Sequence, residues 1–147
     1  QLQERKLASQ YVTMLMAAWD DSNQTLQIAN AGSVQPLFVS RSSEGMTVKT
    51  IKAEGFPLGL FPDVKYEEFT LSTQPGDLIV FFSDGITDAE NGAGEMFGTD
   101  RLRDVLESQP GSAAASTIVD AILKAVSDFQ DGIEHFDDET VVVLRAL

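Results

Sequence analysis

Acidic residues stand at the ends of two apolar runs in this chain of 147 residues. Asp84 lies just after the run 78–82, while Asp137 and Asp138 lie just before the run 140–144. An apolar run bounded by turn residues is typical of a buried strand, and a strand end holds its side chains rigidly. Carboxylate oxygens are the ligands that hard divalent cations prefer. The pattern therefore predicts a metal site formed by these three carboxylates.

A structural role is the alternative for each of these acids, because aspartate often starts a turn or caps the next segment. Each residue taken singly fits that role, whereas two acidic strand ends taken together favour a metal site. Gly85 directly follows Asp84. It would let the backbone turn sharply and let a ligand or water come close, so we expect Gly85 to belong to the same site.

Other catalytic schemes lack residues that they need. The chain has one histidine, His135, and no cysteine, which excludes disulfides and cysteine metal sites. A Ser-His-Asp triad would have to use His135, and no Gly-x-Ser-x-Gly segment supports one. Walker A and Gly-x-Gly-x-x-Gly loops are absent from the sequence. The acids between residues 84 and 88 do not fit an EF-hand loop either.

The charge balance narrows the classes of partner. The chain has 10 Lys and Arg against 23 Asp and Glu, a net charge of −13. This argues against a general nucleic-acid binder, which needs basic residues for phosphate contacts. It favours metal cations or partners with basic surfaces, although plain solubility explains it too. No apolar run approaches the ~18 residues of a membrane span, and residues 1–10 lack a signal-peptide core. The absence of cysteine is compatible with a cytoplasmic location.

Turn signals and hydrophobic periodicity predict a series of strands, then two helices, then a last buried strand. The strands are expected over residues 11–19, 25–30, 36–40, 46–51, 66–71, 78–82 and 140–144. The helices are expected over residues 100–108, with Thr99 as N-cap, and over residues 113–129; residues 1–10 look like the end of a polar helix. This order predicts an α+β fold with a mostly antiparallel sheet, in one domain over residues 1–147.

Segments along nearly the whole chain occur in an order that matches a known family. They include Ala29-Asn30-Ala31-Gly32, Gly55-Phe56-Pro57-Leu58-Gly59-Leu60, Ser83-Asp84-Gly85-Ile86-Thr87-Asp88-Ala89, Glu95-Met96-Phe97-Gly98 and Asp137-Asp138-Glu139-Thr140-Val141. Each piece is weak by itself, but the collinear series is specific. The chain resembles the PPM family of metal-dependent protein Ser/Thr phosphatases, in its bacterial sporulation and stress-sigma-factor regulator branch.

The resemblance implies a fold, a reaction and a site. The fold is a mostly antiparallel β-sandwich flanked by helices, and the cofactors are two Mn²⁺ or Mg²⁺ ions. The family's metal-ligand positions fall on Asp84 and Asp137, and Asp138 matches the position beside the second ligand. The implied reaction is hydrolysis of a phosphoserine or phosphothreonine monoester by a metal-activated water. The implied substrate is a small phosphorylated regulator, such as an anti-anti-sigma factor.

Two departures qualify the resemblance. Ser33 stands where the family usually has histidine, and nothing matches the family's opening strands with their metal-binding Asp residues. We therefore expect the C-terminal part of a domain that lacks its N-terminal strands and is inactive by itself. A non-catalytic phosphatase-like interaction module and an unrelated acidic binding domain remain as alternatives. If leading strands are missing, the strand over residues 11–19 is expected to pair in a homodimer or with a partner chain.

Overall fold

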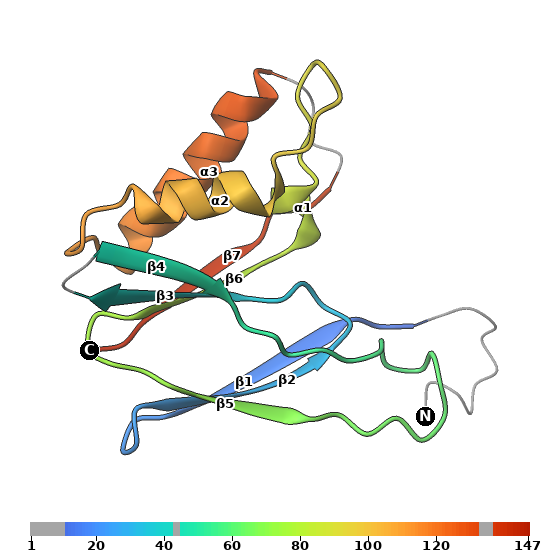
Figure 1. The fold of residues 1–147 in the computed structure, drawn as a ribbon. Helices are drawn as coiled ribbons and strands as arrows, with labels where there is room; N and C mark the ends of the chain where they lie inside the picture. The colour runs from blue at the N-terminus through green and yellow to red at the C-terminus, as the bar shows by residue number, and fades with distance from the viewer. Residues whose placement is uncertain (1–10, 43–44, 133–136) are drawn as a thin grey trace. The chain divides into compact units, whose positions relative to one another are not determined.

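The computed structural model describes residues 11–42, 45–132 and 137–147 (Figure 1). The predicted polar helix end and His135 lie outside these residues. The elements form a three-stranded sheet of order β1-β2-β5 and a four-stranded sheet of order β4-β3-β6-β7, in which all the strand pairs are antiparallel. The predicted α+β class with mostly antiparallel sheet is confirmed. The elements are β1 (Met14–Asp20), β2 (Thr25–Ala31), β3 (Leu37–Ser42), β4 (Gly45–Thr50), β5 (Glu68–Ser72), β6 (Leu78–Phe82), α1 (Asp84–Thr87), α2 (Gly98–Glu107), α3 (Ala115–Gln130) and β7 (Val141–Arg145).

Contacts divide the chain into two compact units, each built from two separate stretches of sequence. Unit 1 comprises Gln1–Gln35 and Ile51–Thr73, and unit 2 comprises Pro36–Thr50 and Gln74–Leu147. Unit 1 holds the three-stranded sheet, while unit 2 holds the four-stranded sheet and the three helices. The assignment of all 147 residues to one domain stays a prediction. In the described residues, no helix is long and apolar enough to cross a membrane.

The β1–β2 hairpin of unit 1 confirms the predicted turn between residues 20 and 24. The Asp20 carboxylate accepts hydrogen bonds from the Asn23 side chain at 2.7 Å and from the backbone amides of Ser22 and Asn23. These bonds favour the charged carboxylate, so they lower the pKa of Asp20, with the Asn23 side chain as the largest cause. The tight turn therefore follows from local polar chemistry, as the sequence indicates.

Strand β1 is shorter than predicted and lies at the edge of its sheet. It begins at Met14, whereas Val12 forms an isolated antiparallel bridge with Leu58. Within the described sheet β1 has β2 as its neighbour, and Met16 on β1 is 62% exposed. Pairing of this edge with a second copy or another chain stays a prediction.

The core of unit 2 lies between its sheet and its helices. Strand β6 contributes Leu78 and Val80, both at most 1% exposed, and Figure 1 shows α2 and α3 on one side of the sheet. The α3 residues Ile118, Ile122 and Val126 recur every four positions, so they share one face of the helix, and all three are fully buried. This apolar face is the one that the sequence predicts. Burial of these side chains fixes the helices on the sheet.

The helix boundaries differ from the prediction in three places. Helix α2 begins at Gly98 with Phe97 as N-cap, so the expected N-cap at Thr99 is wrong. Gly98 has a φ of 74°, which L side chains rarely adopt, and it turns the chain into the helix two residues earlier than predicted. Helix α3 begins two residues later than predicted and ends at Gln130, one residue beyond the predicted end, and its C-cap Asp131 has a left-handed φ of 48°. The one-turn helix α1 occupies a segment for which the sequence predicts neither a strand nor a helix.

Asn30, the second residue of the Ala-Asn-Ala-Gly segment, organises the interior of unit 1. Its side chain is buried, and its Nδ2 donates to the carbonyl oxygens of Ser33 and Ala53, each at 2.9 Å. Its Oδ1 accepts from the Ser33 amide at 2.8 Å. A buried amide with all these partners stabilises one local arrangement of the chain. The segment therefore has a structural role in this protein.

Replacement of Asn30 by aspartate tests this role. Asn30→Asp removes both donors, so two carbonyl oxygens lose their partner and face a buried carboxylate. We expect the free energy of unfolding to fall by about 2–3 kcal/mol, measured by urea denaturation at neutral pH. Gln27→Glu is the matched control, because Gln27 is an exposed amide on the same strand. Equal stability of the two variants would contradict the structural role.

Candidate active site

The two acidic segments lie at the same end of the β6–β7 pair. The strands run antiparallel in a register that extends from Leu78↔Arg145 to Phe82↔Val141. The residues after Phe82 are therefore beside the residues before Val141. The ladder continues by one bond, in which the Ser83 amide donates to the Thr140 carbonyl oxygen at 3.0 Å. The predicted approach of the two segments is thus observed in the backbone.

The side chain of Ser83 adds two further bonds between the segments. Its Oγ donates to the Asp138 carbonyl oxygen at 2.8 Å and accepts from the Thr140 amide at 2.9 Å. Both lengths are typical of well-formed hydrogen bonds. A single hydroxyl therefore links the residue before Asp84 to two backbone groups of the other acidic segment.

Gly85 allows the two segments to approach closely. A Cβ placed on this glycine would lie 2.5 Å from the carbonyl oxygen of Asp138 and 3.0 Å from its carbonyl carbon. Real side-chain carbons do not reach such distances, so only glycine fits unless the backbone moves. The sequence predicts close approach of a ligand or water at Gly85. In the structure, the atom that occupies this space is the Asp138 carbonyl oxygen.

Helix α1 holds Asp84 at a defined position. The Asp84 carbonyl oxygen accepts from the Asp88 amide at 2.8 Å, which closes the single turn. Ile86 in the same turn is fully buried in the core of unit 2. Asp84 itself is exposed, so the turn is anchored on one side and presents its first residue to solvent. Such an anchor limits how far the carboxylate can move.

The other two carboxylates, on Asp137 and Asp138, are also exposed. Oδ1 of Asp137 accepts a hydrogen bond from the Asp138 amide at 2.8 Å. Oxygen donors of this kind fit Mg²⁺ and Mn²⁺. Within the described residues, no group of three or more His, Cys, Asp or Glu side chains is placed to hold a metal ion. The acids thus supply part of a ligand set, and their metal-binding role stays a prediction.

Strand β7 is less buried than predicted. It lies at the edge of the described four-stranded sheet, and Val142 is 54% exposed. No residue of β7 is fully buried, so the expectation of a buried last strand is wrong. Val141 and Val143 are half-buried against the core of unit 2, while Val142 lies on the alternate face of the strand. The physical reason is that an edge strand has a neighbouring strand on one side only, and successive side chains point to opposite faces of the sheet.

The loop between α1 and α2 has a defined structure. Oδ1 of Asn91 accepts from the amides of Ala93 and Glu95, each at 3.0 Å. The Arg101 guanidinium donates to the Met96 carbonyl oxygen at 2.8 Å and lies 4.6 Å from the centre of the Phe129 ring. The Glu95-Met96-Phe97-Gly98 segment is thereby connected to both α2 and α3. Its acids lie on a hairpin-like turn outside the β6–β7 junction.

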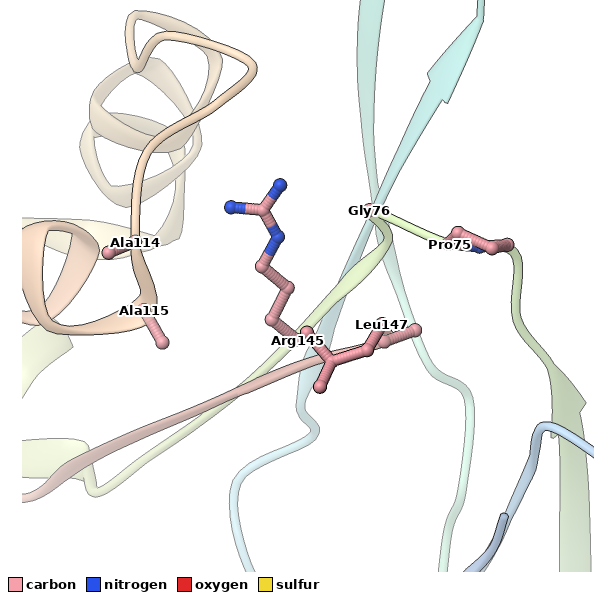
Figure 2. Close-up of a pocket in the computed structure, with 7 residues that line it drawn as sticks. Pro75, Gly76, Ala114, Ala115, Arg145 and Leu147 are labelled. Atoms are coloured by element: carbon pink, nitrogen blue, oxygen red, sulfur yellow. The ribbon is translucent and has the colours of Figure 1, made fainter. Parts of the chain in front are cut away.

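A pocket of about 590 Å³ lies at the opposite end of the β6–β7 pair (Figure 2). Figure 2 shows Arg145 extending from the end of β7, and its Nη1 donates to the Ala113 carbonyl oxygen at 2.7 Å. The lining contains no carboxylate side chain among the described residues, so it does not suit a divalent cation. The lining residues are Pro75, Gly76, Ala114, Ala115, Arg145, Ala146 and Leu147.

Ser83 is the site residue that the sequence interpretation missed. It was noted as part of the Ser-Asp-Gly segment, and no role was assigned to it. The position of Ser83 in the sequence is itself a signal, because a serine between a buried strand and an acidic residue can form a hydrogen bond to the backbone of a neighbouring segment. The partner segment could not be identified without the register of β6 and β7.

Comparison with known proteins identifies related sequences. The family model described as stage II sporulation protein E matches residues 1–147. The phosphoserine phosphatase RsbU of Bacillus subtilis is 32% identical over 141 residues, covering 94% of this chain and 40% of that protein. Protein IcfG of Synechocystis is 31% identical over 134 residues, covering 91% of this chain and 20% of that protein. The chain thus spans less than half the length of these relatives.

Solved structures show the same fold. The SiaA PP2C domain of Pseudomonas aeruginosa superposes with a TM-score of 0.77 at 20% identity, over 97% of this chain and 55% of that one. The phosphatase domain of SpoIIE from Bacillus subtilis gives a TM-score of 0.68 at 21% identity, over 97% of this chain and 62% of that one. The described fold therefore corresponds to just over half of each of these domains.

Proposed function

Because the chain belongs to the stage II sporulation protein E family, we propose that the intact protein is a metal-dependent protein serine/threonine phosphatase. The observation that carries the proposal is the junction at which Ser83 bonds to Asp138 and Thr140, since it joins the two acidic segments. RsbU, which is named a phosphoserine phosphatase, supports the same reaction. The proposal extends to the whole protein, of which these residues supply one part.

Under this proposal, Asp84 and Asp137 bind Mn²⁺ or Mg²⁺, with Asp138 and the backbone at Gly85 beside them. When bound, the cations supply an activated water and offset charge on the phosphoryl oxygens. The chain's own contribution is geometric. Helix α1 carries Asp84, and the hydrogen bonds of Ser83 hold the backbone of residues 138 and 140, so this part of the geometry exists before an ion binds. Further ligands come from residues outside the described set.

The substrate in this proposal is a small phosphorylated regulator of the anti-anti-sigma type. The sigma-factor branch of the family and the likeness to RsbU support this choice. The net charge of −13 favours a partner whose docking surface is basic or neutral. A cytoplasmic location belongs to the same proposal and agrees with the absence of cysteine from the sequence.

A phosphatase assay tests the proposed function. We expect the intact protein to hydrolyse p-nitrophenyl phosphate and a phosphoserine protein when Mn²⁺ is present, and EDTA to abolish both reactions. The 147-residue chain alone is expected to give little or no turnover, because two or three carboxylates cannot hold a two-metal centre. An inactive intact protein that folds and binds Mn²⁺ would favour the non-catalytic interaction module. Robust turnover by the isolated chain would contradict the proposal that further metal ligands come from residues outside the described set.

A further inference from the structure

Ser83 is joined to the opposite acidic segment by three hydrogen bonds. Its amide donates to the Thr140 carbonyl oxygen, its Oγ donates to the Asp138 carbonyl oxygen, and the same Oγ accepts from the Thr140 amide. The bonds reach both sides of residue 139, so the segment is held at two points. Asp84 follows Ser83 directly, and Asp137 precedes the first of these points.

We infer that Ser83 is a positioning residue for the metal site, in that its hydroxyl fixes the separation between Asp84 and Asp137. This inference rests on the proposed function. Ser83 and Gly85 act in a complementary way. The hydroxyl binds the backbone of residues 138 and 140, while the missing side chain at Gly85 leaves room for the Asp138 carbonyl oxygen. Together they define how closely the two segments approach.

The chemistry of this link requires a hydroxyl group. The group has to donate to a carbonyl oxygen and accept from an amide at the same time, which alanine and valine cannot do. Threonine can do both, and the extended backbone of Ser83, with φ −84° and ψ 163°, suits a β-branched residue. Threonine is therefore the conservative replacement, and valine differs from threonine in the hydroxyl alone.

Loss of the Ser83 hydroxyl is expected to weaken metal binding while the fold is kept. The amide of Ser83 and the β6–β7 ladder remain when the side chain is removed, so the strands stay paired. The segment around Asp138 would lose its second anchor, and the carboxylates would then have to be ordered by the ion itself. Residues that orient metal ligands typically affect metal affinity by about 10- to 100-fold when they are replaced.

The test uses the intact protein with Ser83→Ala, Ser83→Thr and Ser83→Val, and Mn²⁺ affinity is measured by isothermal titration calorimetry. We expect Ser83→Ala and Ser83→Val to bind Mn²⁺ about 10- to 100-fold more weakly, and Ser83→Thr to keep the wild-type affinity. Excess Mn²⁺ should restore most of the lost phosphatase activity. Hydrogen exchange at the Thr140 amide should accelerate in the alanine and valine variants only.

Ser108→Ala is the matched control, since its hydroxyl donates to the Val105 carbonyl oxygen at the end of α2. It should leave Mn²⁺ affinity unchanged. Wild-type Mn²⁺ affinity in Ser83→Ala would overturn the inference. Equal Mn²⁺ affinities in the folded Ser83→Thr and Ser83→Val variants would overturn it too, and this comparison decides the question if Ser83→Ala does not fold. A wild-type protein that neither binds Mn²⁺ nor turns over substrate would instead overturn the proposed function, while Thr140 exchange would still report on the link.

Discussion

Asp84→Asn and Asp137→Asn are each expected to reduce the Mn²⁺-dependent phosphatase activity of the intact protein by about 100-fold or more. The change removes a negative charge while it keeps the size of the side chain. Metal ions contribute several kcal/mol to the stabilisation of a phosphoryl-transfer transition state, and each 1.36 kcal/mol corresponds to a tenfold change in rate. Steady-state kinetics over a range of Mn²⁺ concentrations measures the loss.

The thermal stability of these variants should stay close to that of the wild type. Both carboxylates are exposed, and an asparagine at position 137 keeps the Oδ1 atom that accepts from the Asp138 amide. Asp104→Asn is the control, because Asp104 is an exposed acid on α2, away from the β6–β7 junction. Full activity in Asp84→Asn or Asp137→Asn would assign that residue a structural role only.

Gly85→Ala should lower both activity and stability. The new Cβ would lie 2.5 Å from the Asp138 carbonyl oxygen, which belongs to the backbone and cannot rotate away. One segment therefore has to shift, at a cost of about 1–3 kcal/mol in the free energy of unfolding. A displacement of about 1 Å between catalytic groups can reduce the rate by about 100-fold. Urea denaturation and the Mn²⁺-dependent assay measure the two effects.

Gly92→Ala provides the comparison for this prediction. Gly92 lies in the loop between α1 and α2, and a Cβ added to it meets no atom within 4 Å. Neither activity nor stability should change in this variant. If Gly85→Ala behaved in the same way, the two acidic segments would be free to move apart, and their close packing would have no bearing on the reaction.

The interior elements of unit 2 could be predicted from the sequence because their signals are local. The run from Leu78 to Phe82 is continuously apolar, and Ile118, Ile122 and Val126 recur at helical spacing, so each segment's secondary structure follows from its own residues. The boundaries were less certain. Thr99 has the side chain of an N-cap, but the left-handed Gly98 starts α2 before it.

The identity of the acidic residues and the family order of their segments were likewise determined by the sequence alone. Asp84, Asp137 and Asp138 could be selected because each stands beside an apolar run. The tertiary structure decided how these acids are held. The register of β6 and β7 selects Asp138 and Thr140 as partners of Ser83 and places the Asp138 carbonyl oxygen over Gly85. Such contacts join residues more than fifty positions apart, and their geometry depends on how whole strands pair, which no local pattern specifies.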